Sequence, residues 1–197
     1  PSLRPTNYTR NLFHVGAALV AIVIVELVPL VSPWGFWAVV LVACGFALMG
    51  WSMEIGRVLS ERINDALMRL FRLVSHPHEA HHVNSSTWYV SALALLSLTF
   101  EPMVCAAALA VLGLGDPVAA IIGKRWGRHR LENGRSLEGT AAFIAAGAAA
   151  AALALALAHP GVGPGLIAAM SLAAAVVGGV TELVLERIDD NLGVPVA

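Results

Sequence analysis

An aspartate stands within a long apolar stretch of the sequence, shortly before a dense run of basic residues. Asp116 lies between Gly115 and Pro117, and the basic run begins at Lys124. If this stretch crosses a membrane, the acid costs about 2.5–3.5 kcal/mol at mid-bilayer and less near the edge, so it needs a partner or a purpose. Mg²⁺ binds through one or two carboxylates together with substrate phosphates, so one acid beside several cations indicates a nucleotide–metal site. A basic anchor after a kinked membrane helix is the simpler alternative.

The residues around Asp116 suit a ligand that carries phosphate groups. Gly115 and Gly123 allow the backbone to approach a ligand closely, and basic side chains neutralise phosphate charge. The candidate phosphate-binding side chains are Lys124, Arg125, Arg128, Arg130 and Arg135. Farther along, Ser136 and Glu138 stand at the start of another apolar stretch. Ser136 can cap a helix there, whose free amides can hold a phosphate, although capping without a ligand is the alternative.

A second acidic cluster follows the last long apolar stretch. Its members are Glu182, Glu186, Asp189, Asp190 and Asn191. Two acidic sites facing one basic loop predict a single metal–phosphate centre, in which the metal ligands are Asp116, Asp189, Asp190 and Asn191. A solvated helix end is the alternative.

Other polar residues are candidates for binding or activating an acceptor hydroxyl. His14 and Glu26 occur within the first apolar stretch, and either side chain can orient or deprotonate a hydroxyl group. His14 is better placed for chemistry, whereas a buried, hydrogen-bonded acid is the simpler interpretation of Glu26. The segment His76–His82 has the composition of a zinc site, but its proline favours a polar loop. Glu79 and Asn84 remain candidates for the active site.

The composition shows which elements must position these residues. Of the 197 residues, 58% are hydrophobic and 13% are charged, and the mean hydropathy is +0.76, which excludes an ordinary soluble domain. Stretches long enough to cross a bilayer, about 20 residues each, are Leu12–Val31, Trp34–Met53, Met103–Gly123, Gly139–His159 and Gly163–Val184. A sixth stretch, Thr87–Phe100, is short and crosses only if its helix recruits the preceding polar residues or the bilayer thins locally.

The charges require the sixth span. With six spans and a cytoplasmic N-terminus, all 12 basic residues fall on the cytoplasmic side, in agreement with the positive-inside rule. From Ile55 to Val74, apolar residues recur with a helical period, which predicts an amphipathic helix along the inner interface. We therefore expect an all-α, polytopic membrane bundle of about six transmembrane helices plus this interfacial helix. It forms one integral membrane catalytic domain over residues 1–197, and a net charge of −1 gives no support for nucleic-acid binding.

Taken together, these segments resemble the family of CTP-dependent lipid-alcohol kinases that includes dolichol kinase, phytol kinase and the yeast-type diacylglycerol kinase. The family's Gly-Asp element and basic loop are matched by Gly115, Asp116, Ala119, Gly123, Lys124, Arg125, Gly127 and Arg128. Its Gly-Lys-Ser-x-Glu-Gly element is matched by Gly134, Ser136, Glu138 and Gly139, with Arg135 where lysine is usual. Its closing element is matched by Asp190, Asn191 and Pro195, and its N-terminal element only in part, by Arg10, His14 and Gly16.

The resemblance implies a kinase that transfers phosphate from CTP, with Mg²⁺, to a lipid alcohol at the cytoplasmic face. The acceptor would be a polyprenol such as dolichol, phytol or diacylglycerol, entering from the inner leaflet. Asp116, His14 and Glu138 would be catalytic, and Arg10 would join the nucleotide-binding residues. The preference for CTP over ATP rests on the resemblance alone.

Two other functions compete with this prediction. Phosphatidate cytidylyltransferase, a relative with similar elements, ends in an Asp-Arg-x-Asp group that Glu186–Asp189 matches only faintly, whereas Asp190 and Asn191 fit the kinase ending better. A proton- or ion-coupled transporter would use Glu26, Asp116 and Glu182 as a relay. Such a relay would spread its acids through the membrane, whereas most of the acids here gather at the inner edge.

Overall fold

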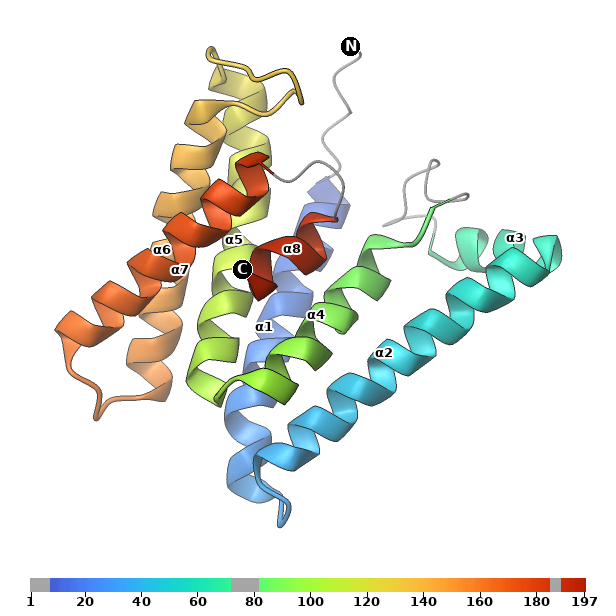
Figure 1. Cartoon of the computed structure of the whole chain (residues 1–197), viewed down its shortest axis with the longest axis horizontal. Coiled ribbons are helices and arrows are strands. Elements are labelled where there is room, and N and C mark those ends of the chain that lie inside the picture. Colours follow the sequence, from blue (N-terminus) through green and yellow to red (C-terminus); the bar gives the residue numbers. More distant parts are fainter. Residues whose placement is uncertain (1–7, 72–81, 185–188) are drawn as a thin grey trace.

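The computed structural model describes residues 8–71, 82–184 and 189–197, and this part of the chain is helical (Figure 1). The helices are α1 (Tyr8–Val31), α2 (Phe36–Leu59), α3 (Glu61–Leu70), α4 (Ser85–Thr99), α5 (Pro102–Trp126), α6 (Leu137–Ala158), α7 (Pro164–Val184) and α8 (Asp190–Val196). Within the described ranges the only β-type pairing is an isolated bridge between Arg130 and Ser136. The prediction of an all-α fold is confirmed.

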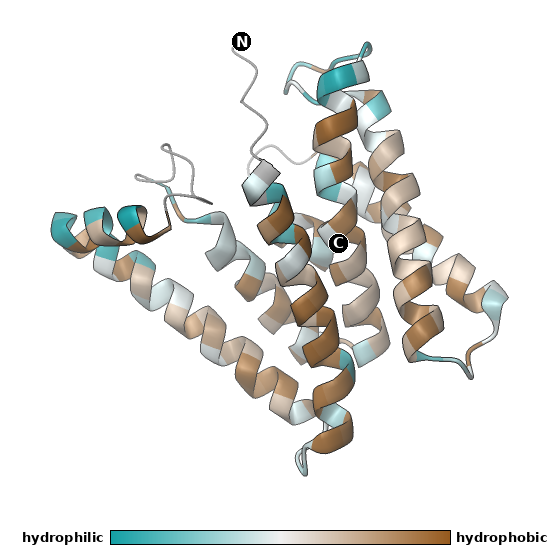
Figure 2. Ribbon diagram, turned by 180° about the vertical axis from the view of Figure 1, so that it is seen from behind, coloured by the Kyte–Doolittle hydropathy of each residue, from teal (hydrophilic) through white to brown (hydrophobic). Residues whose placement is uncertain are grey.

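Five of the described helices are long and apolar enough to cross a membrane: α1 from Asn11 onward, α2, α5, α6 and α7. The predicted sixth span is α4, whose 15 residues extend only about 22 Å. Figure 2 shows hydrophobic residues along the helices, and hydrophilic residues gathered on α3 and on the loop between α5 and α6. The chain is therefore a polytopic helical membrane protein, as predicted.

The two ends of the bundle differ in character. One end, called the loop end below, carries the α5–α6 loop, the start of α1, the start of α4 and the end of α7 (Figure 1). The opposite end, called the hairpin end, carries only the short connections α1–α2, α4–α5 and α6–α7. Every candidate residue that needs water or a nucleotide must therefore lie at the loop end.

Helix α5 forms the centre of the bundle, packed against α1, α6 and α7. Small residues permit this close packing. A Cβ atom added to Gly113 would lie 2.3 Å from the Cβ of Ala18 on α1, and one added to Gly147 would lie 3.1 Å from Val111. The short helix α8 packs between α4, α5 and α7 and buries Val194 and Pro195. It thereby joins the α4 side of the molecule to the α5–α7 side.

The predicted interfacial helix begins later than the sequence indicated. Helix α2 continues to Leu59, Ser60 is extended with φ −148° and ψ 115°, and α3 begins only at Glu61. The reason is a buried ion pair inside α2, where Arg57 Nη1 donates to both carboxylate oxygens of Glu54 at 2.9 Å. Because the two charges satisfy one another, this part of the chain stays in the long apolar helix. No residue of α3 is buried, as expected for a helix at an interface.

Candidate active site at the loop end

The α5–α6 loop folds back on itself as a short hairpin. The backbone N–H of Leu131 donates to the carbonyl of Arg135 at 2.8 Å, and that of Leu137 donates to the carbonyl of His129 at 3.0 Å. Gly134 turns the chain with φ +83°, a conformation that L side chains rarely adopt. The basic residues of the loop are therefore presented from a defined backbone.

Glycines bring the end of α5 against the start of α6. Ser136 is the N-cap of α6, and its Oγ accepts a hydrogen bond from the N–H of Gly139 at 3.1 Å, which confirms the predicted cap. A Cβ atom on Gly127 would lie 2.1 Å from the carbonyl oxygen of Gly123 and 2.6 Å from Ser136 Oγ. This junction has no room for larger residues. The predicted role of Ser136 in phosphate binding stays a prediction.

Glu138 holds the loop from the first turn of α6. One of its carboxylate oxygens lies 2.7 Å from His129 Nδ1, and the backbone N–H of His129 donates to both oxygens at 3.2 Å. The structure thus places Glu138, a predicted catalytic residue, in contact with the loop. Its contacts fix the position of the loop backbone.

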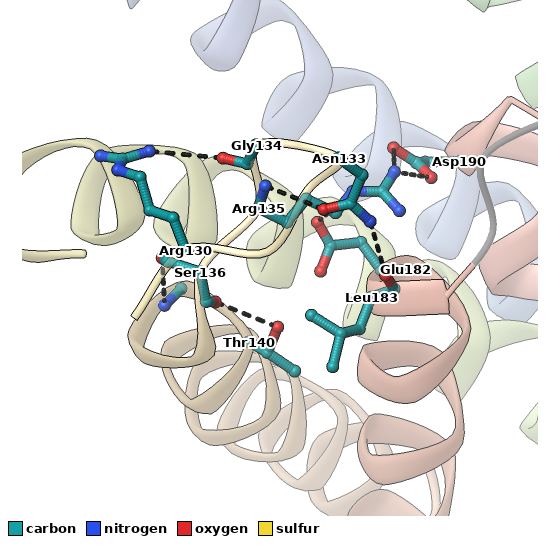
Figure 3. A network of polar contacts seen from close by, with 10 residues as sticks. Arg130, Asn133, Gly134, Arg135, Ser136, Thr140, Glu182, Leu183 and Asp190 are labelled. Carbon is teal, nitrogen blue, oxygen red and sulfur yellow. Dashed lines mark hydrogen bonds and ion pairs between the residues drawn. The ribbon is translucent and has the colours of Figure 1, made fainter. Parts of the chain in front are cut away.

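Arg135 connects the loop to the C-terminal segment (Figure 3). Its Nη2 lies 2.6 Å from both oxygens of Asp190, and its Nε lies 3.4 Å from Glu182. Beside it, the Asn133 amide donates to the backbone carbonyl of Leu183 at 2.9 Å. The sequence predicted Arg135 as a phosphate ligand, but the structure pairs it with two carboxylates. These contacts position the acidic cluster, and the role of Arg135 in phosphate binding stays a prediction.

The two predicted acidic sites interact electrostatically. Burial raises the pKa of Asp190 to about 6, the Arg135 guanidinium acts in the opposite direction, and the charges of Asp116 and Asp189 add to the rise. Asp116 also acts electrostatically on Glu182. The prediction that Asp116 and the C-terminal acids share one region is consistent with these interactions.

Asp189 and Asn191 form a local unit at the start of α8. Oδ1 of Asp189 accepts hydrogen bonds from the backbone and side-chain nitrogens of Asn191, at 3.0 and 2.8 Å. Its other oxygen lies 3.5 Å from the Ser85 hydroxyl on α4. The neighbouring Asn84 caps α4 by accepting from the N–H of Ser86 at 2.8 Å. The candidate Asn84 therefore borders the acidic cluster.

Asp116 differs from its acidic neighbours because no hydrogen bond or ion pair joins its carboxylate to any described residue. The side chain is half-buried on α5. A carboxylate with unused oxygens that acts electrostatically on Asp190 fits Mg²⁺, which takes one or two carboxylates and completes its shell with phosphates and water. Within the described ranges, no group of three or more His, Cys, Asp or Glu side chains is already gathered for a metal ion.

The basic residues divide into structural and available ones. Arg130 donates to the carbonyls of Gly123 and Gly134 at 3.0 and 3.3 Å, which stabilises the loop. Arg125 lies over the Trp126 ring, 5.0 Å from its centroid, and both side chains are exposed, as is Arg128. Arg125 and Arg128 are therefore available to bind an anion.

Several sequence candidates lie elsewhere. Glu26 is within 3.1 Å of His159 Nε2, and His159 follows α6 at the hairpin end. Twelve residues of helix, about 18 Å, separate Glu26 from His14, so the structure does not bring Glu26 to the site. Glu79, the side chain of Arg10 and most of the His76–His82 segment lie outside the described residues.

The sequence reasoning missed Glu54. It is 8% exposed, and besides Arg57 its carboxylate accepts from the N–H of Asn84 at 3.1 Å and the hydroxyl of Thr87 at 3.3 Å. The cluster holds the start of α4 against α2. The sequence did contain a signal for this ion pair, because Glu54 and Arg57 are opposite charges three residues apart inside an apolar stretch.

An apolar groove of about 350 Å³ separates α4 from α7. Residues that line it include Leu96, Phe100, Val111, Met170, Val194 and Pro195. Because its lining contains no titratable side chain, it can hold hydrocarbon but adds no chemical group to the site.

Comparison with known proteins gives one informative relationship. Phytol kinase from Synechocystis sp. is 30% identical to this chain over 152 residues, which cover 74% of this chain and 57% of that protein. The chain thus spans little more than half the length of this curated relative. No protein-family model and no solved structure matches the chain. The chain is therefore similar to a kinase whose name states a lipid alcohol as its substrate.

Proposed function

We propose that this protein is a membrane kinase that transfers the γ-phosphate of a nucleoside triphosphate, CTP in our assignment, to a lipid alcohol. The observation that carries this proposal is the carboxylate of Asp116, which has no hydrogen bond or ion pair to a described residue. It acts electrostatically on Asp190 and lies on the helix that leads into the basic loop. The similarity to phytol kinase supports the same reaction class. Phytol or another lipid alcohol is the proposed acceptor.

The proposed nucleotide site uses residues of the loop end. Arg125, Arg128 and Lys124 neutralise the triphosphate, and the α6 N-terminus capped by Ser136 adds backbone amides. Asp116, with Asp189 or Asp190, would hold Mg²⁺, which offsets the charge on the phosphates. Because the basic residues gather at this end, we place it at the cytoplasmic face.

The transfer itself requires positioning more than covalent chemistry by the protein. The hydroxyl oxygen of the alcohol forms a bond to the γ-phosphorus while the bond to the β–γ bridging oxygen breaks, which leaves the nucleoside diphosphate. The hydroxyl proton passes to His14 Nε2, which has no partner among the described residues. The products are a lipid phosphate and CDP.

The test is transfer of label by the purified protein in lipid nanodiscs with Mg²⁺. γ-Labelled CTP and ATP are each offered with phytol, a polyprenol and diacylglycerol, and Asp116→Asn is compared with wild type. Glu132→Gln is the matched control, because Glu132 is an exposed acid of the neighbouring α5–α6 loop. We expect labelled lipid from wild type and Glu132→Gln, and a loss of at least about 100-fold in Asp116→Asn. Formation of CDP-lipid from α-labelled CTP and phosphatidate, with no γ-transfer, would instead identify a cytidylyltransferase.

A further inference from the structure

Three buried polar atoms near the loop end have no hydrogen-bond partner within the described chain. They are Nδ2 of Asn11, Nε2 of His14 and the hydroxyl of Tyr89. Leaving such a group buried and unpaired costs about 1–3 kcal/mol, so native proteins rarely retain one without a purpose. Tyr89 is only 9% exposed, which removes bulk water as its partner.

Two of these side chains meet across α1 and α4, and the third lies one turn away on α1. Asn11 and His14 are three residues apart on α1 and therefore share a face of that helix. The rings of His14 and Tyr89 meet edge to face, with centroids 5.8 Å apart and an interplanar angle of 68°. Tertiary packing thus brings the His14 and Tyr89 rings together, and the helical spacing places Asn11 on the same face of α1 as His14.

The cluster lies at the same depth in the bundle as Asp116. Helices α1 and α5 run in opposite directions (Figure 1), and Gly113 on α5 packs directly against Ala18 on α1. Because the two helices are antiparallel, one turn toward the loop end leads from Ala18 to His14 on α1 and from Gly113 to Pro117 on α5. His14 therefore lies level with Asp116, which precedes Pro117. On α4, Tyr89 lies one turn below Ser85, which contacts Asp189.

We propose that Asn11, His14 and Tyr89 bind the hydroxyl group of the acceptor lipid, an assignment that rests on the proposed function. An alcohol needs one acceptor for its proton and one or two donors for its oxygen. His14 accepts the proton at Nε2, while the Asn11 amide and the Tyr89 hydroxyl donate to the oxygen. This set fits a single hydroxyl on a hydrocarbon chain, since no unpaired carboxylate or cation belongs to the cluster.

The test uses Tyr89→Phe and His14→Gln in nanodiscs. Tyr89→Phe removes only an unpartnered hydroxyl and keeps the ring contact with His14, so the variant should fold. Ser171→Ala on α7 is the matched control, because Ser171 Oγ is another buried hydroxyl without a partner among the described residues. The measurements are the KM for phytol, the KM for the nucleotide, and the phytol-dependent rise in unfolding temperature without nucleotide.

We expect Tyr89→Phe and His14→Gln each to weaken phytol affinity about fivefold to tenfold, because each variant loses one hydrogen bond to the alcohol. The KM for the nucleotide should stay unchanged. Ser171→Ala should change neither KM. The inference is overturned if both variants keep the wild-type KM and thermal shift for phytol, which would mean that water alone occupies the cluster. It is also overturned if both substrates weaken equally. The two proposals can fail separately. If wild-type protein shows a phytol-dependent rise in unfolding temperature that Tyr89→Phe reduces, but transfers no phosphate, the proposed function is refuted and the lipid-binding site is still supported.

Discussion

One nitrogen of Arg135, Nη2, lies 2.6 Å from each carboxylate oxygen of Asp190, although the two residues are 55 positions apart in the chain. This contact joins the α5–α6 loop to the start of α8. Both side chains are less than a third exposed, at 22% and 31%. This guanidinium group, together with the hydrogen bond from Asn133 to the carbonyl of Leu183, therefore fixes the position of the acidic cluster relative to the basic loop.

Replacing Arg135 with Gln should uncouple the loop from the acidic cluster. We expect a loss of about 1–3 kcal/mol in unfolding free energy, because Asp190 and Glu182 lose their charged donor. Phosphate transfer should fall by more than tenfold. Arg135→Lys is the control, since lysine keeps the charge and is the usual residue here in the family that the sequence resembles. Thermal unfolding and label transfer measure both effects, and equal losses in the two variants would contradict a role based on charge.

The raised pKa of Asp190 predicts how stability depends on pH when divalent metal is removed with EDTA. Burial raises the pKa of this carboxyl to about 6 in the folded protein, well above the ordinary value of about 3.9 for an aspartate in an unfolded chain. Its contribution to stability is therefore full below about pH 4 and is lost as the pH rises through 6. The difference in unfolding temperature between wild type and Asp190→Asn should change over this window. A constant difference from pH 4 to pH 7 would show that Asp190 titrates normally.

Adding a methyl group at Gly127 should open the α5–α6 junction. The new Cβ would clash with the carbonyl oxygen of Gly123 and with Ser136. We expect Gly127→Ala to cost about 1–3 kcal/mol, as overpacking usually does, and to weaken nucleotide binding. Gly161→Ala at the hairpin end is the control, because a Cβ there meets no atom within 4 Å. Unfolding temperature and nucleotide titration should separate the two variants.

The buried acid Glu54 should contribute to stability more than to catalysis. Glu54→Gln leaves the Arg57 charge, whose side chain is 8% exposed, without its carboxylate. Breaking a buried ion pair costs about 3–5 kcal/mol. Glu61→Gln, at an exposed position in the adjoining α3, should cost almost nothing. If Glu54→Gln unfolds at the wild-type temperature, the pair does not hold α4 against α2.

The sequence was most informative where the signal is local. Hydropathy located the membrane-crossing helices, and the serine before an apolar run predicted the cap at Ser136, because both depend on neighbouring residues. The pairing of Arg135 with Asp190 and the contact between His14 and Tyr89 depend on how helices rotate against one another. A single sequence contains no measure of that rotation. The sequence therefore grouped Arg135 with the other phosphate-binding candidates and gave no signal for Tyr89.

The shortness of α4 determines how a lipid can reach this site. A helix of 15 residues, about 22 Å long, covers less than the roughly 30 Å of a bilayer's hydrocarbon. If its hairpin end lies at one surface, its other end, with Ser85 and Asp189, lies below the opposite headgroups. A lipid alcohol can then reach the carboxylates without withdrawing its chain into water, which would cost about 0.8 kcal/mol for each CH₂ group. Turnover should accordingly follow the mole fraction of the alcohol in the membrane rather than its concentration in the bulk solution.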